Sequence, residues 1–180
     1  MVSEQNKMYE IMKISAIIIS TVAATALIAC GTQAGITGSM SKAERQIYVA
    51  NQVYDNLSNR QYTIEVDAMK PLRGSMRMLN DRYELTVKAD TVVSYLPYFG
   101  DVYRVNPYSQ QIGLNFTGTI YDYVATMVQQ GQYRISFKTK TQEDTYVYNI
   151  DLYDNGKSDI NVYGDFHDAI SFTGQMAITY

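Results

Sequence analysis

Apolar and polar residues alternate over most of this chain, and short turns interrupt the alternation. The first clear case runs from Tyr62 to Ala68, where every second residue is apolar and the residues between are polar. Successive side chains of a β-strand point to opposite faces, so a period of two is typical of a strand with one buried face. The alternation therefore predicts a mainly β chain.

Further strands are expected to follow up to the C-terminus. They are predicted at Tyr83–Val87, Val92–Tyr95, Thr119–Gln129, Gln132–Lys140, Asp144–Tyr153, Ser158–Tyr163 and Ala169–Thr179. Asn155-Gly156 is the strongest hairpin signal and predicts a type I′ turn, whereas prolines and glycines make residues 96–113 irregular. Because short turns pair neighbouring strands antiparallel, a meander of about eight to ten strands should result, and curling it into a barrel, closed or partly open, removes exposed edges.

One helix is predicted before the strands, over Ser41–Asn59. Its apolar stripe is expected at Ala43, Ile47, Ala50, Tyr54 and Leu57, at spacings of three and four. Ser41 followed by Glu44 has the pattern of a capping box. A helix of this length needs a surface to cover its stripe, so we expect it to dock on the sheet.

The N-terminal region has the pattern of a lipoprotein signal. Ile14–Ile28 is almost wholly apolar but short for a membrane span, and it ends in small residues before Cys30. Leu27-Ile28-Ala29-Cys30 resembles a lipobox, where a bacterial signal peptide is cut before a lipid-modified cysteine. The alternative is a buried free cysteine in an apolar helix. We therefore expect a signal peptide at 1–29, a flexible tether at 30–40 and one domain at 41–180.

Cys30 is the only cysteine, so no intramolecular disulfide can form. Acylation at this residue, for example with palmitate, would anchor the protein to a membrane through several chains. Gly31 stands where an aspartate typically retains lipoproteins at the inner membrane, and no acidic cluster follows. These features favour the outer membrane of a Gram-negative bacterium, and its periplasmic face over the cell surface.

Composition excludes some functions. The net charge is −3, which is unlike the basic surface that nucleic-acid binding requires, so no nucleic-acid partner is expected. His167 is the only histidine, which rules out multi-histidine metal sites and cysteine–histidine catalysis. The chain has 17 tyrosines and no tryptophan, and tyrosine suits both strands and wet binding surfaces.

Several segments together resemble a known family. They are residues 69–77, 90–100, 113–116, 143–146 and 155–156, in that order along the chain, together with the lipobox. They are similar to the signature of the domain of unknown function 4251 family, small lipoproteins of Gram-negative gut and oral anaerobes. The resemblance covers essentially the whole chain after Cys30. It implies a lipocalin-like barrel, and it implies no activity, no catalytic residue and no cofactor.

An aromatic stretch at the end of a predicted strand is the first candidate site. Pro97 cannot donate a hydrogen bond to a sheet, so the chain should leave the sheet there. The candidate ligand or partner rim consists of Tyr95, Pro97, Tyr98, Phe99, Gly100 and Phe116. The alternative is a plug that closes the barrel with buried rings, and Leu96 is expected in the core in either case.

Basic residues are concentrated between two predicted strands and form the second candidate. The candidate basic patch consists of Lys70, Arg73, Arg77 and Arg82. It would suit lipid phosphates or an acidic partner, and the alternative is a solvated loop. Acidic residues at Asp151, Asp154 and Asp159 do not have the spacing of a calcium loop, and Glu65, Asp67 and Asp122 are expected on solvated strand faces.

No nucleophile motif accompanies His167, so no catalytic residue, cofactor or metal site is predicted. We expect a non-enzymatic binding module for a small apolar or glycan ligand, or for an envelope protein. The alternative is a structural or assembly lipoprotein with a packed barrel, and an envelope hydrolase is the least favoured reading.

Overall fold

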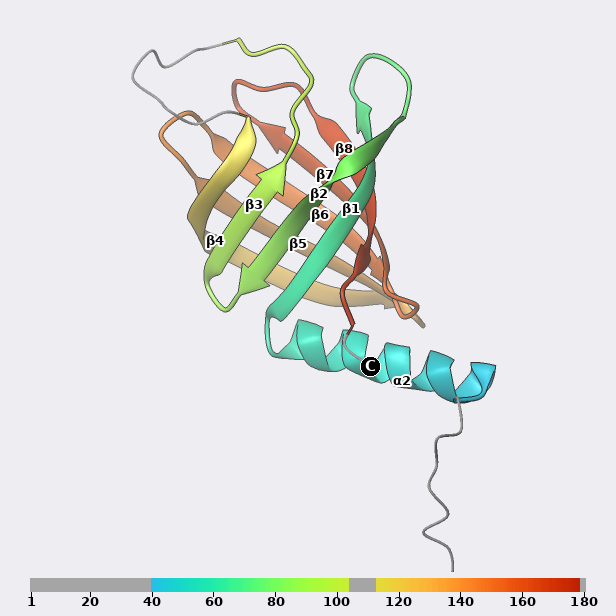
Figure 1. The fold of residues 1–180 in the computed structure, drawn as a ribbon. Coiled ribbons are helices and arrows are strands. Elements are labelled where there is room, and N and C mark those ends of the chain that lie inside the picture. The colour runs from blue at the N-terminus through green and yellow to red at the C-terminus, as the bar shows by residue number, and fades with distance from the viewer. Residues whose placement is uncertain (1–39, 104–112, 179–180) are drawn as a thin grey trace, which may run out of the picture. The chain divides into compact units, whose positions relative to one another are not determined.

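A computed structural model describes residues 40–103 and 113–178 of the protein (Figure 1). The predicted signal peptide, Cys30 and the tether up to residue 39 lie outside the described residues. In the described part of the chain, one helix precedes eight strands. The elements are α2 (Lys42–Ser58), β1 (Gln61–Pro71), β2 (Arg77–Lys88), β3 (Thr91–Leu96), β4 (Leu114–Gln129), β5 (Gln132–Lys140), β6 (Thr145–Tyr153), β7 (Lys157–Gly164) and β8 (Ile170–Met176).

The eight strands form a closed antiparallel barrel. Each strand pairs with the next along the chain, and β8 pairs back onto β1 between Ile64–Met176 and Pro71–Ile170. Up-and-down barrels of this size are the architecture that lipocalins also use. The predicted mainly β fold with one N-terminal helix is therefore confirmed, and the barrel is closed.

Strand boundaries and one turn differ from the prediction. β2 begins at Arg77 and β4 at Leu114, earlier than the predicted Tyr83 and Thr119. The type I′ turn is wrong, because Gly156 has a φ of +81° while Asn155 has no positive φ. The Gly156 N–H donates to the Tyr153 carbonyl at 2.8 Å. This geometry fits a type I turn followed by a left-handed glycine, the common three-residue hairpin.

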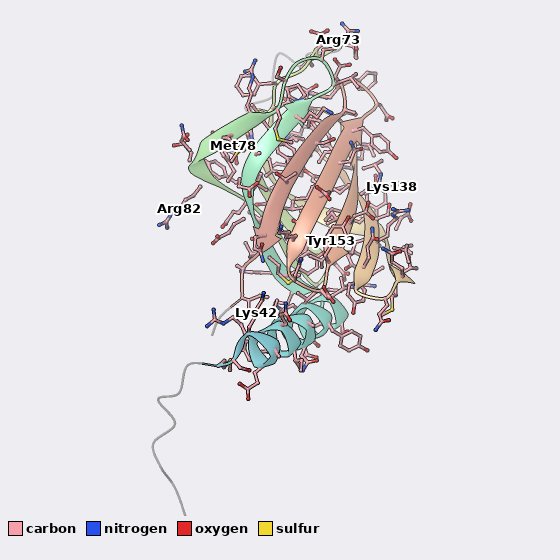
Figure 2. All side chains as sticks on the ribbon, turned by 90° about the vertical axis from the view of Figure 1, so that its right-hand side faces the viewer. Lys42, Arg73, Met78, Arg82, Lys138 and Tyr153 are labelled. Atoms are coloured by element: carbon pink, nitrogen blue, oxygen red, sulfur yellow. The ribbon has the colours of Figure 1, made fainter. Side chains whose placement is uncertain are left out.

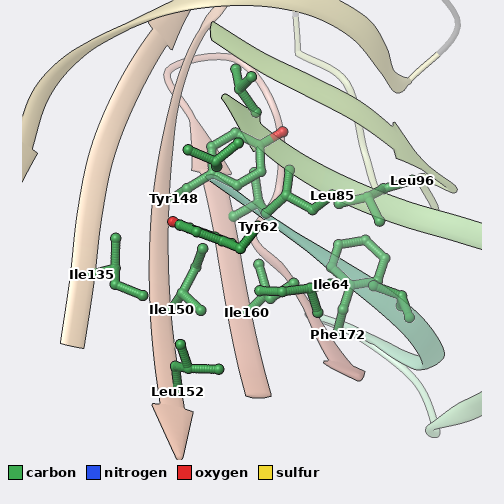
Figure 3. Packing of buried hydrophobic residues seen from close by; sticks show 14 of the residues in the cluster. Tyr62, Ile64, Leu85, Leu96, Ile135, Tyr148, Ile150, Leu152, Ile160 and Phe172 are labelled. Atoms are coloured by element: carbon green, nitrogen blue, oxygen red, sulfur yellow. The ribbon is translucent and has the colours of Figure 1, made fainter. Parts of the chain in front are cut away.

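Large side chains fill the interior of the barrel (Figure 3). The largest, Phe137, Tyr146, Tyr148 and Phe172, are each at most 1% exposed. The buried Tyr148 hydroxyl donates to Ser94 Oγ at 3.0 Å, and Ser94 donates to the Leu114 carbonyl at 2.7 Å. These aromatic side chains belong to one cluster of buried residues that extends from α2 through the barrel. The described interior is thus a packed core, as small barrels allow.

Helix α2 lies across one end of the barrel (Figures 1 and 2). Its predicted capping box is present: the Glu44 N–H donates to Ser41 Oγ at 3.3 Å, and the Ser41 N–H donates to Glu44 Oε2 at 2.9 Å. Among the described residues, no helix is long and apolar enough to cross a membrane.

The buried face of α2 differs from the predicted stripe. Val49, Val53 and Leu57 join the barrel core, whereas Ile47 is 63% exposed and Tyr54 is 55% exposed. Consecutive helical residues are rotated by about 100°, so the true stripe lies one residue around from the predicted one. The prediction was wrong because apolar residues cover a wide arc of this helix, and only Leu57 belongs to both stripes.

The docking of α2 can be tested with Leu57→Ala. Leu57 is only 7% exposed, so its truncation should leave a cavity and lower the free energy of unfolding by about 2–5 kcal/mol. The matched control is Ile47→Ala, which should change that energy by less than about 0.5 kcal/mol because the side chain is exposed. Urea denaturation measures both, and equal effects would contradict the observed helix orientation.

Candidate functional site

The end of the barrel opposite α2 carries the candidate site. The loops that follow β1, β3, β5 and β7 all lie at this end, because the connections of a meander alternate between its two ends. β3 ends at Leu96, which is 3% exposed, and Pro97 takes the chain out of the sheet as expected. The residues that follow fold over the mouth of the barrel.

Tyr98 joins two loops that are far apart in sequence. Its hydroxyl donates to the carbonyls of Asp101 at 3.0 Å and Asp168 at 3.2 Å, and its ring meets His167 edge-on at 5.3 Å. A side chain at Gly113, where φ is +60°, would place its Cβ 2.8 Å from the Tyr98 Cβ. Glycine therefore allows both the left-handed backbone and this close approach.

The backbone fastens the same two loops to each other. Val102 and His167 form an isolated antiparallel bridge, and the Tyr103 N–H donates to the Phe166 carbonyl at 2.8 Å. The Tyr103 hydroxyl also donates to Asp168 Oδ1 at 2.5 Å. Residues 97–103 are thereby held in place at the barrel mouth.

A buried carboxylate ties a third loop into this end. Asp144 accepts hydrogen bonds from the backbone N–H groups of Thr145, Asp165 and Phe166, at 2.7, 3.0 and 2.9 Å. It also contacts His167 Nδ1 at 2.7 Å, and the side chains of Asp144 and His167 are 0% and 4% exposed. Because four groups saturate this carboxylate, it acts as a structural anchor between the loops after β5 and β7.

His167 faces a second buried group on its other side. Its Nε2 lies 3.4 Å from the Tyr146 hydroxyl, and Tyr146 is 1% exposed and stacks on Phe116. Burial, reinforced by the nearby Asp144 carboxylate, raises the pKa of the Tyr146 phenol. The phenol therefore stays protonated, and this Asp–His–Tyr chain is closed to solvent.

An open cleft of about 380 Å³ lies beside this cluster. We call it the rim cleft. It is lined by Pro71, Arg73, Arg77, Tyr98, Phe99, Gly100, Asp101 and Asp168. It combines two guanidinium groups, two carboxylates and an exposed phenyl ring, since Phe99 is 49% exposed. Such a lining can hydrogen-bond a ligand as donor and as acceptor while the ring covers an apolar face.

Charges in the rim cleft are partly paired. Arg73 lies 3.4 Å from Asp101 Oδ2, and the Arg77 guanidinium lies 5.1 Å from the centre of the Phe99 ring. The hydrogen bond from Tyr103 lowers the pKa of Asp168, so this carboxylate stays ionised at neutral pH. Burial, together with the Asp168 charge, raises the pKa of Tyr98 to about 12 and keeps its hydroxyl protonated.

Comparison with known proteins decides the family. The model of the domain of unknown function DUF4251 matches residues 44–176. The chain belongs to the DUF4251 family. A crystal structure of a DUF4251 family protein from Bacteroides eggerthii DSM 20697 is similar at a TM-score of 0.54 and 12% identity, over 72% of this chain and 87% of that one. At this identity the likeness shows the fold alone. No match was found among curated proteins.

The predicted aromatic rim of this DUF4251 chain is divided by the fold. Tyr98, Phe99 and Gly100 line the rim cleft, and Pro97 precedes them. Phe116 does not line the cleft and instead stacks on the buried Tyr146 ring. Tyr95 does not join them, because it stacks on Tyr83 at 5.4 Å and is 44% exposed.

The predicted basic patch is also divided. Arg73 and Arg77 line the rim cleft, while Lys70 lines a separate cleft of about 330 Å³ on the outside of the barrel. Arg82 lies further along β2, well apart from Arg73 in Figure 2. Only half of the patch therefore converges on one site.

Sequence reasoning missed the acidic half of the rim cleft and its support. Asp101, Asp168, Tyr103 and Asp144 were not singled out, although the meander places their loops at one end.

Elsewhere, Asp122 pairs with Lys138 at 2.9 Å and Asp151 pairs with Arg134 at 2.8 Å. Within the described ranges, no group of three or more histidine, cysteine, aspartate or glutamate side chains is arranged to hold a metal ion.

The anchoring role of Asp144 can be tested with Asp144→Ala. Removing the carboxylate leaves three backbone N–H groups and His167 without their acceptor, so the free energy of unfolding should fall by at least about 3 kcal/mol. Asp165→Ala is the control, because this side chain is exposed and its backbone N–H is kept. Urea denaturation should separate the two variants, and similar losses in both would argue against the anchor.

Proposed function

We propose that this protein is a periplasm-facing outer-membrane lipoprotein and that its barrel is a non-enzymatic binding module. The rim cleft would be its binding site. The barrel core supports a site at the rim, because large buried side chains such as Phe137, Tyr148 and Phe172 occupy the interior. A ligand would therefore bind where loops meet rather than inside the barrel.

The observation that carries this proposal is that the rim cleft and α2 lie at opposite ends of the barrel. α2 closes the opposite end of the barrel and begins at Lys42, directly after the predicted tether (Figure 1). Acylation of Cys30 would hold that end near the membrane. The rim cleft would then face away from the membrane and meet ligands in the periplasm.

The lining suggests a polar, hydroxyl-rich ligand such as a glycan, or the surface of an envelope protein. Arg77 offers a donor fork, the exposed Asp101 carboxylate offers an acceptor, and Phe99 offers an apolar face. A purely apolar ligand fits poorly in a cleft that would strip water from these charges.

An enzymatic role is disfavoured by the state of the one histidine. His167 is held between Asp144 and the Tyr146 phenol, and its side chain is 4% exposed. A general base must reach the proton that it abstracts, and this imidazole is enclosed.

The filled interior favours a second candidate, a structural or assembly lipoprotein with no small ligand.

Acylation is tested by metabolic labelling with a clickable fatty acid. The wild-type chain should carry the label and shift to the outer-membrane fraction. Cys30→Ser should carry none, because the chain has no other thiol. Equal labelling of the two proteins would exclude Cys30 as the anchor.

Binding at the rim cleft is tested by native mass spectrometry of the protein released from envelope extract. Wild type should retain an added mass, and Phe99→Ala or Arg77→Ala should weaken its retention about tenfold, as expected for an anchor residue of a binding site. Tyr95→Ala is the control, because Tyr95 is a comparably exposed aromatic residue outside the cleft. Retention lost equally in the control would rule out the rim cleft, and an absence of any added mass would favour the structural role.

A further inference from the structure

The barrel end that carries α2 exposes a group of apolar side chains. We call it the tether-end face. It consists of Tyr54 on α2 and of Val124 and Met127 on β4, which line one groove and are between 54% and 58% exposed, together with Ile47 on α2, which is 63% exposed. Large apolar side chains that gather on one face of a protein usually mark a surface that something else covers.

On α2, the exposed residues flank the buried stripe. Tyr54 follows Val53, which is 0% exposed, and is rotated from it by about 100° around the helix. Ile47 lies on the same side as Tyr54, two turns earlier. The helix therefore has an apolar side left over after it has docked on the barrel.

On β4, the exposed residues belong to a strand that lacks a second neighbour. β3 pairs only with Leu114–Thr119, whereas β5 pairs with β4 from Ile120 to Gln129. At Asp122 the backbone has a φ of +55° and the register skips a residue, which is the pattern of a bulge that bends a strand. The second half of β4 thus runs along the barrel end with one edge unpaired by any described strand.

The bulge at Asp122 bends this edge, but the edge beyond it has no charge of its own. From Tyr123 to Tyr133 the β4–β5 hairpin has no charged residue. Exposed edge strands of soluble proteins are normally blunted by lysine, proline or other charges. An open groove of about 560 Å³ separates the hairpin from the end of α2, and Tyr54, Leu57, Tyr123, Met127 and Tyr133 are among its lining residues.

We propose that the tether-end face rests on the lipid leaflet that receives the acyl chains of Cys30. This inference depends on the proposed anchor. The predicted tether ends at residue 40 and α2 begins at Lys42, so the tether-end face is the first folded surface beyond the anchor. A tether of this length spans about 18 Å root-mean-square, which keeps the face within reach of the leaflet.

The chemistry of the face suits the membrane interface. Tyrosine is favoured at headgroup depth, where its ring meets lipid and its hydroxyl meets water. Valine, isoleucine and methionine can enter the upper acyl region, and the hairpin has no charged side chain of its own. The Arg60 guanidinium, 4.3 Å from the centre of the Tyr123 ring, would lie at headgroup depth. The anchor keeps the tether-end face at a high local concentration near the leaflet. A weak affinity of this face for lipid is therefore sufficient for contact.

The experiment uses the chain from Cys30 onward, made without acylation. The described core lies between Val49 and Met176, so this chain keeps the folded domain. Its single cysteine is coupled to a maleimide-headgroup lipid in vesicles of phosphatidylethanolamine and phosphatidylglycerol, part of which is brominated on the acyl chains near the glycerol. The chain has no tryptophan, so Met127→Trp introduces a single fluorescent reporter.

Met127→Trp, and Ile47→Trp as a second reporter, should lose most of their fluorescence to the bromine atoms and shift their emission to the blue. Tyr95→Trp is the matched control, since Tyr95 is similarly exposed but lies on the outer wall away from this face. It should keep its fluorescence. Circular dichroism verifies that each variant is folded.

Two results would overturn the proposal. In the first, the bromine atoms quench all three reporters equally, or quench none of them. In the second, Met127→Trp is already blue-shifted without vesicles and the protein has the mass of a dimer, which would assign the face to a second copy of the chain. Because the coupling is chemical, neither result depends on whether the cell acylates Cys30, and the labelling experiment tests that separately.

Discussion

Hydrogen bonding between β1 and β8 closes the sheet, and the rest of the structure depends on that closure. The pairing runs from Ile64–Met176 to Pro71–Ile170, with an irregularity between Val66 and Ala68. Once the sheet is closed, every second side chain points into one enclosed space, where Phe137 and Tyr148 pack face to face at 4.9 Å. A closed and filled barrel can bind a partner only at its two ends or on its outer wall.

The meander then gives the two ends different chemistry. Loops after β1, β3, β5 and β7 meet at one end, so residues about seventy positions apart, such as Asp101 and Asp168, line a single cleft. The Asp144 carboxylate holds two of these loops together, and Tyr98 holds the third. The other end has short turns and α2, and part of its exposed surface is apolar. This difference between the two ends agrees with the proposed anchor at one end and the proposed binding site at the other.

A mismatch in strand length underlies the apolar end. β3 has 6 residues and β4 has 16, so β4 extends well beyond its neighbour. Pro97 prevents β3 from continuing in the sheet at the rim end, and the turn at Ala89, where φ is +52°, limits it at the other. The overhanging half of β4 bends at Asp122 and lies near α2 without completing the sheet. The same local features therefore shape both the rim cleft and the tether-end face.

The sequence by itself determined the number and direction of most strands, the capped helix and the end of β3 at Leu96. These are local properties: alternation sets which face of a strand is buried, and a proline or a capping serine acts on its own neighbours. The same alternation already implies that Tyr95 points away from Leu96, so the grouping of Tyr95 with the rim was avoidable. Tertiary structure alone decided which side of α2 is buried, because its apolar arc is wider than the surface that it covers. Tertiary structure also decided that Arg73 and Arg77 meet Asp101 and Asp168, because those contacts exist only after the closed barrel brings distant loops to one end.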